Sequence, residues 1–455
     1  MLKKHPKGLI SLFFTESWER FGFYGMRALL PLYMFGAIQD GALGWSNKTS
    51  MQIYGWYIGI AYVTTLLGGW FADKMIGQRR SIMLGGFLMA LGYFSLALGS
   101  MPSFFTGLVL ICFGNGFFKP CVTSMLGGLY EKNDARRDSG YSIFYMGINL
   151  GAFAGPFICG TLQGLKGYQW GFAAAGVGML ISIIVFWYAQ KSRFGTIGLA
   201  PNRKAMKDVP KVPLNKQEKS NILVLTIIAM FTILFIVAFE QAGGLLALYA
   251  DKYTDRNLLG FMIPTAWFQS LNPFFIVILA PVMSWVWSLF AKYKKDLSMA
   301  VKVSLGFFLT AISFAFMMGA AVQFGAIGKS ALVWLVAFNF FCTLGELCIN
   351  PIVWSNVSKL APTRYISSMM AVILVCIGMG GYLSGFIGSY VDDLGPYQIF
   401  GGITAMMIVT GFALLTLNKK LKAMTYVQIE SQIEKAKEAI EEKVEEKEPA
   451  LSGVE

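Results

Sequence analysis

Long runs of apolar residues recur along the whole chain, separated by short polar stretches. Twelve of these runs approach or exceed the ~20 residues that a helix needs to cross ~30 Å of hydrocarbon. We place them at residues 9–36, 51–72, 80–99, 103–126, 139–163, 169–190, 220–249, 262–290, 299–322, 329–354, 366–390 and 396–417. The pattern predicts an all-α polytopic membrane protein with twelve transmembrane helices.

The composition agrees with this class. Hydrophobic residues make up 55% of the chain and charged residues 14%, against ~25% charged in an average soluble domain. The first run is interrupted by charges and has no small-residue cleavage site, so we expect no cleavable signal peptide. All six cysteines fall in predicted helices without a CxxC pair. They are predicted to pack in the interior, with no disulfide and no metal site.

Lysine and arginine gather in alternate connections between the predicted helices, and the net charge is +13. Short basic loops stay on the cytoplasmic side of a membrane. We therefore expect a multi-pass protein of a cell membrane, such as a bacterial inner membrane, with both termini in the cytoplasm. This bias explains the net charge, so no binding to nucleic acid is expected.

A basic connection divides the helices six and six. The predicted parts are an N-terminal bundle at 1–190, a cytoplasmic linker at 191–219, a C-terminal bundle at 220–418 and a charged, solvated tail at 419–455. The bundles echo each other: CFGNGFFKPCV (112–122) aligns with TLGELCINPIV (343–353), and SWERFG (17–22) with AFEQAG (238–243). Such repeats are typical of transporters whose site lies between two halves near the bilayer midplane.

Charged residues interrupt several of the apolar runs. In the first run, Glu16, Glu19, Arg20 and Arg27 share a helical arc of about 100°. Further charges within predicted helices are Lys119, Glu240 and Glu346. A charge that faces lipid costs on the order of 2.5–3.5 kcal/mol, so such groups normally face a partner or a water-filled cavity. Their convergence predicts a working site, the alternative being structural ion pairs between helices.

The connection GWFADKMIGQRR (69–80) resembles the loop signature of the major facilitator superfamily. Its glycines permit a tight turn and close helix approach, while the aspartate and the basic side chains can form a cytoplasmic latch that breaks during rocking. The predicted latch residues are Gly69, Asp73, Arg79 and Arg80. The alternative is an ordinary basic loop.

Five further blocks, spread over residues 9–418, carry a more specific resemblance. They are ESWERFGFYG, GNGFFKP, FYMGINLGAFAGP, AFEQAGG and WFQSLNPFFIVILAP. They resemble blocks of the proton-dependent oligopeptide transporters of the major facilitator superfamily. The resemblance implies a symporter that imports di- and tripeptides by alternating access, with protons as the coupling ion and no other cofactor.

The same resemblance implies roles for individual residues. The substrate carboxylate would meet Arg20 and Lys119, and its amino end Glu346, assisted by Asn149 and Asn272. Tyr24 and Tyr62 would line the cavity. Glu16 and Glu19 would form ion pairs with Lys119, and Glu240 would couple protons near Arg20. Gln241, the neighbour of Glu240, is a weaker candidate for a functional role. These assignments name Glu16, Glu19 and Glu240 as the proton-coupling set.

Three features depart from the family pattern and concern substrate preference. Phe23 replaces a tyrosine of the signature, and SSMMAVILVCIGMGG lacks the usual tryptophan. The connection at 191–219 is too short for the extra helix pair that many bacterial members carry between the halves.

Alternatives remain open at this stage. The scaffold could carry another small anion or a peptide-like drug, or act as a membrane peptide sensor that does not transport. No nucleophile–base pairing or phosphate loop indicates an enzyme. The one histidine, His5, precedes the first helix, so carboxylates must carry proton coupling. We expect a monomer to be functional.

Overall fold

The structure, a computed structural model, describes residues 5–131, 134, 136–199, 214–293, 297–362 and 365–445. Its long helices are α1 (Lys7–Phe35), α2 (Asn47–Phe71), α3 (Gln78–Ala97), α4 (Met101–Gly128), α5 (Arg137–Lys166), α6 (Tyr168–Ser192), α7 (Lys216–Phe239), α9 (Leu271–Lys292), α10 (Met299–Ile327), α11 (Leu332–Leu360), α12 (Ile366–Gly388) and α14 (Pro396–Glu445). Shorter helices are α8 (Leu245–Lys252) and α13 (Val391–Leu394).

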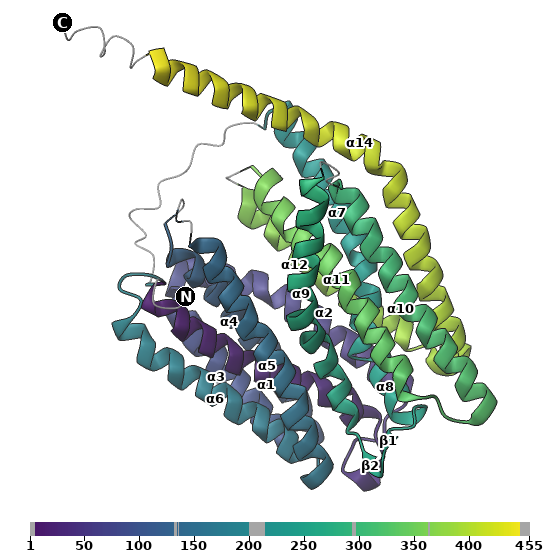
Figure 1. The fold of residues 1–455 in the computed structure, drawn as a ribbon. Coiled ribbons are helices and arrows are strands. Elements are labelled where there is room, and N and C mark those ends of the chain that lie inside the picture. Colours follow the sequence, from purple (N-terminus) through teal and green to yellow (C-terminus); the bar gives the residue numbers. More distant parts are fainter. Residues whose placement is uncertain are drawn as a thin grey trace, which may run out of the picture.

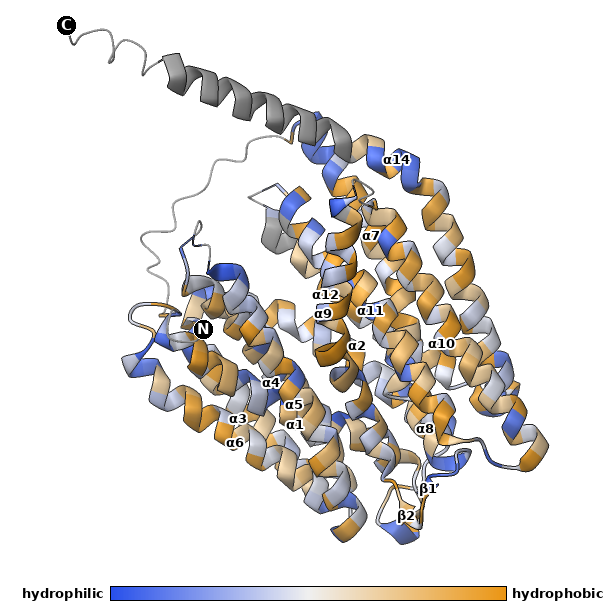
Figure 2. Ribbon diagram, viewed as in Figure 1, coloured by the Kyte–Doolittle hydropathy of each residue, from blue (hydrophilic) through white to orange (hydrophobic). Residues whose placement is uncertain are grey.

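Ten helical segments in the described part of the chain are long and apolar enough to cross a membrane. Helices α1 and α2 complete the predicted twelve. Apolar side chains such as Phe87, Val109 and Val277 point outward and are more than half exposed. Figure 2 shows hydrophobic residues along the spans and hydrophilic ones toward the helix ends. This distribution suits contact with lipid.

Helix starts are fixed by polar side chains that satisfy free backbone N–H groups. Ser46 accepts a bond from the backbone of Thr49 at the start of α2. Ser100 and Ser103 form a reciprocal capping box at α4, as Asn215 and Glu218 do at α7. The turns between spans are thereby set by the sequence itself.

The helices form two bundles, α1–α6 and α7–α14, here called the N half and the C half (Figure 1). In the N half α1 packs on α5 and α6, and α3 on α4 and α6. In the C half α7 packs on α12 and α14, and α10 on α11 and α14. The same pairs recur in both halves, which confirms the predicted pseudo-symmetry.

The repeat extends to individual glycines. A Cβ on Gly114 would lie 2.6 Å from the carbonyl oxygen of Gly85, and a Cβ on Gly345 would lie 2.8 Å from that of Gly306. Both contacts join the third and fourth spans of a half. Gly114 and Gly345 are the residues that the sequence alignment of the halves matched, so the repeat preserves a close backbone approach.

Three boundaries differ from the prediction. The span predicted at 220–249 breaks after α7 into a 3₁₀ turn, Glu240–Ala242, and then α8, because consecutive glycines at 243 and 244 disfavour a continuing helix. Helix α14 passes the predicted boundary at residue 418 without a break. A two-stranded hairpin, β1 (Asn257–Leu258) and β2 (Phe261–Met262), precedes α9 and was not predicted.

The predicted linker at 191–219 and tail at 419–455 lie partly outside the described residues. No helix occurs in the described parts of the connection between α6 and α7, at 193–199 and 214–215. The expectation that this connection carries no extra helix pair also concerns residues 200–213, which lie outside the described residues.

The halves meet at one end and diverge at the other (Figure 1). We call the face where α1 begins the terminal face and the opposite one the far face. Toward the far face a Cβ on Gly55 of α2 would lie 3.0 Å from the Cα of Gly385 of α12. Trp267 donates its indole N–H to Thr161 of α5 at 3.0 Å. The structure is therefore closed at the far face.

Candidate functional site

Three charged side chains of α1 form a compact buried group. The Arg20 Nε lies 3.1 Å from the Glu16 Oε1, and Nη2 donates to the Glu19 Oε1 at 2.9 Å. All three are at most 4% exposed. The Arg20 guanidinium also lies 5.1 Å from the centre of the Phe23 ring, so Phe23 keeps a cation–π contact without the hydroxyl of a tyrosine.

A second group joins the halves. Arg27 of α1 forms an ion pair with Glu240 and donates from Nε to the Tyr54 hydroxyl at 2.8 Å. Glu240, which the resemblance placed near Arg20, forms its ion pair with Arg27, two turns further along α1. Because Arg27 and Glu240 belong to different halves, the pair helps to hold the far face closed.

Lys119 on α4 is held differently. Its Nζ lies 4.5 Å from the centre of the Tyr62 ring. No carboxylate among the described residues lies within ion-pair distance of Lys119. The predicted ion pairs of Glu16 and Glu19 with Lys119 are therefore absent from this conformation, because both carboxylates already bind Arg20.

Glu346 on α11 is held by amides. Asn272 donates to its Oε2 at 2.9 Å and Asn350 to its Oε1 at 3.2 Å. Its side chain has no cation within ion-pair distance among the residues described. Amide donors satisfy the oxygens but leave the charge uncompensated. The carboxylate can thus still bind a cation.

The other predicted substrate residues play less direct roles in this conformation. Asn149, 4% exposed, donates to the backbone oxygen of Tyr145 on its own helix at 2.9 Å. Tyr24 packs its ring 5.4 Å from Phe23. Gln241 donates to the Ser384 backbone oxygen at 3.1 Å, which fixes the 3₁₀ turn to α12.

The glycine that packs closely against α4 is Gly68, which lies just before the predicted latch segment at 69–80. A Cβ on Gly68 would lie 2.1 Å from the Gly116 carbonyl oxygen, whereas one on Gly69 would make ordinary contact with Pro120 at 3.7 Å. Gly77 has φ +81° and makes the tight turn. The close approach between α2 and α4 therefore belongs to Gly68.

The charged latch residues do not close on one another here. Arg79 donates to the backbone oxygens of Ile197 and Gly195 at 2.7 and 2.6 Å. Asp73 and Arg80 are exposed, and Asp73 has no ion-pair partner among the described residues. The terminal ends of the halves diverge, so an open latch fits this conformation.

Sequence reasoning missed two side chains that complete the site, Tyr54 and Asn350. Asn350 follows Glu346 by four residues, a helical spacing that could have indicated the contact. Tyr54 carries no such signal, since its partner Arg27 lies on another helix.

It also missed a polar cluster at the far face. Asn47 donates to Asp392 at 2.7 Å and accepts from Lys252 at 2.9 Å. Lys48 lies 3.9 Å from Asp393. These residues join the start of α2 to the C half, and we call them the far-face cluster.

The arrangement suits recognition of a zwitterion better than covalent chemistry. It offers a lysine in one half and a carboxylate in the other, each lacking an ionic partner among the described residues, with a further arginine held by two carboxylates. No group of three His, Cys, Asp or Glu side chains able to hold a metal occurs in the described ranges.

Comparisons with known proteins agree with this geometry. Residues 79–214 and 203–399 match the POT family. The chain is 37% identical to the peptide transporter YePEPT of Yersinia enterocolitica, over 91% of this chain and 94% of that protein. It is 30% identical to the di-/tripeptide transporter of Lactococcus lactis subsp. cremoris, over 91% and 96%. A crystal structure of a peptide transporter POT in complex with sulfate superposes with TM-score 0.85 at 31% identity, covering 92% and 96%.

Proposed function

The chain belongs to the POT family of proton-dependent oligopeptide transporters, and we propose that it imports di- and tripeptides together with protons. It is a multi-pass membrane transporter of the major facilitator fold, and it is not an enzyme. The relatives compared above are a peptide transporter and a di-/tripeptide transporter. The substrate of this chain is argued below from its own charges.

One observation carries the peptide assignment. Lys119 in the N half and Glu346 in the C half lack ionic partners among the described residues. A short peptide has a carboxylate at one end and an ammonium at the other, so it can satisfy both. Leaving a desolvated charge without a partner costs several kcal/mol, which favours a ligand with both ends over a simple anion.

Protons act through carboxylates that already hold arginines. Protonating Glu16 or Glu19 removes one of the two negative charges that bind Arg20. The guanidinium can then assist Lys119 in binding the peptide carboxylate. Protonating Glu240 weakens its hold on Arg27, so the halves can part at the far face. Coupling follows if proton and peptide stabilise the same conformations.

We place the terminal face in the cytoplasm. Basic residues of the connections, including Lys74, Arg80 and Lys292, lie at that end, as the positive-inside rule requires. The protein then resides in a cell membrane, which in a bacterium is the inner membrane, and both termini lie in the cytoplasm. Both charged ends of the substrate meet one chain, so the monomer is the transporting unit, with protons as coupling ion and no nucleic-acid partner.

The test is competition in proteoliposomes under an inward proton gradient. Free dialanine and trialanine should compete for uptake of a labelled dipeptide. Amidating the carboxylate or acetylating the amine should weaken competition by roughly 1–3 kcal/mol, the usual cost of an unsatisfied buried polar group, which is about 5- to 150-fold. The assignment fails if blocked peptides compete as well as free ones, or if nitrate competes where peptides do not. Peptide binding without uptake would indicate a sensor.

A further inference from the structure

The terminal ends of the two halves are packed differently. In the N half, α6 ends at Ser192 and the chain folds back, so that Phe194 is only 2% exposed. Three backbone carbonyl oxygens within residues 195–198 accept hydrogen bonds from Arg79. In the C half, α14 occupies the place of α6 but continues as a helix.

A cavity of about 840 Å³ lies at this position, lined by α9, α10, α11 and α14 of the C half and by Tyr145 of α5. Its described lining includes lysines from three helices, Lys302, Lys359 and Lys422, and no aspartate or glutamate. Lys302 lies 5.4 Å from the centre of the Trp287 ring, and Ser298 donates to Asn418 at 2.6 Å. The mouth is therefore basic and braced by contacts between helices.

The floor of the cavity is apolar. Met283 of α9 and Leu347 of α11 line it. Leu347 precedes Lys359 on the same helix by a separation of about 18 Å along the axis. Half of the ~30 Å hydrocarbon thickness is ~15 Å, so the cavity reaches from the headgroup level through one leaflet.

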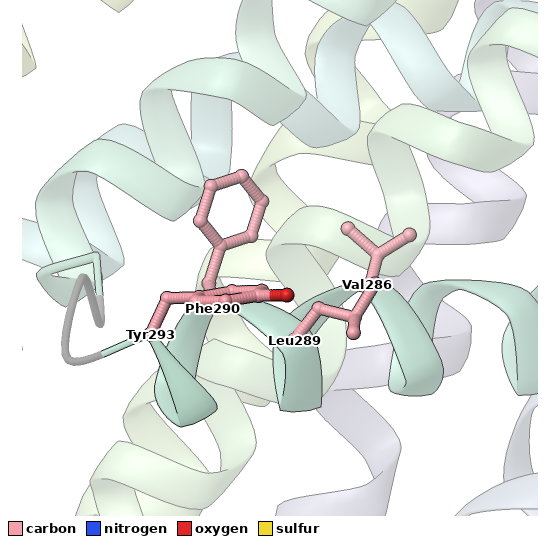
Figure 3. Close-up of a pocket in the computed structure, with 4 residues that line it drawn as sticks. All are labelled: Val286, Leu289, Phe290 and Tyr293. Atoms are coloured by element: carbon pink, nitrogen blue, oxygen red, sulfur yellow. The ribbon is translucent and has the colours of Figure 1, made fainter.

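Helix α9 has a second hollow, on another face. Val286, Leu289, Phe290 and Tyr293 line a space of about 390 Å³ (Figure 3). These residues recur at helical spacing and none is charged, so ordinary lipid tails suffice to fill it. The lysine-lined cavity is the one with chemical selectivity.

We propose that the cavity between α9, α10, α11 and α14 binds an anionic phospholipid of the leaflet at the terminal face. The phosphate lies among Lys302, Lys359 and Lys422, and an acyl chain runs inward along Met283 and Leu347. Basic pockets between transmembrane helices are known to take such headgroups. The lipid phosphate binds basic side chains at the terminal end of the C half. In the N half, backbone carbonyl oxygens of residues 195–198 bind Arg79 in a similar way.

The experiment is lipid titration of the purified protein by native mass spectrometry. Phosphatidylglycerol should bind more tightly than phosphatidylcholine with the same acyl chains. Replacing Lys302, Lys359 and Lys422 by Gln should weaken phosphatidylglycerol binding by about fivefold for each lysine. The matched control replaces three exposed lysines outside the cavity, Lys191, Lys419 and Lys420, and should bind as the unmodified protein does.

Two further variants keep the test decisive. Lys359→Gln alone should weaken binding about fivefold, so the result does not depend on the triple variant folding. Met283→Trp should fill the floor and weaken binding of both lipids without changing charge. The proposal is overturned if the two lipids bind equally, if the control variant loses as much as the cavity variant, or if excess inorganic phosphate displaces the lipid.

Discussion

The N half and the C half share their helix contacts but differ in how they neutralise buried charge. In the N half, Glu16 and Glu19 both bind Arg20 on a single helix. In the C half, Glu240 reaches across to Arg27 and Glu346 is held by amides alone. The repeat thus supplies the scaffold, while the charges that differ between halves supply the site. An ion pair across the interface suits a gate, and a carboxylate without a cation suits a ligand.

Breaking the pair across the interface should have the largest effect. Glu240→Gln leaves Arg27 buried without its counter-ion, and loss of one partner of a buried pair costs ~3–5 kcal/mol. We expect proton-driven accumulation of peptide to be lost, while exchange of peptide across the membrane survives. Both are measured in proteoliposomes, with and without a proton gradient. Glu131→Gln, the same change at an exposed residue, is the control. Retained accumulation would move the coupling role to Glu16 or Glu19.

The next prediction sharpens the contrast between Lys119 and Glu346. Lys119→Ala should remove the penalty for the amidated peptide and keep that for the acetylated one. Glu346→Ala should do the reverse. Each penalty is about 5- to 150-fold in competition, corresponding to roughly 1–3 kcal/mol. If both variants lose the same penalty, the two residues do not bind opposite ends of one ligand.

The far-face cluster should contribute less than the buried pair. Asn47→Ala removes contacts to Asp392 and Lys252, and exposed polar contacts are worth at most ~1 kcal/mol. We expect a shift of up to about fivefold toward the far-face-open state. Spin labels at Ile38 and Leu259, exposed positions in the two halves, report it as a longer distance. A distance distribution identical to that of the unmodified protein would assign the cluster no part in closure.

The smallest effect is expected at Asp73. It is exposed and has no ion-pair partner among the described residues in this conformation, so Asp73→Asn should leave peptide binding unchanged. If the latch closes in the opposite conformation, the rate of transport should still change. Binding affinity and initial uptake rate, measured on the same preparation, separate the two. An unchanged rate would show that the segment is an ordinary basic loop.

Local features of the sequence predicted local features of the structure. The repeat and the twelve spans follow from hydropathy and spacing, and the Glu16–Arg20 contact follows from helical geometry. The pairing of Arg27 with Glu240 does not, because these residues are 213 positions apart in the sequence and meet only when the two halves pack together. The sequence did not predict the hairpin either, because Leu259, at φ +53°, occupies a turn position where glycine or asparagine is usual.

The charges of α1 also bear on how the protein is made. Each charged residue near the centre of a helix costs ~2.5–3.5 kcal/mol on translocon scales, so α1 inserts poorly as an isolated segment. Its packing partners α5 and α6 are synthesised later, and α6 is complete roughly 8 to 30 seconds after α1 at ~5–20 residues per second. During that interval α1 needs a chaperone, an insertase or the membrane interface to hold it. Biogenesis of the first helix is thus tied to the arrival of the sixth.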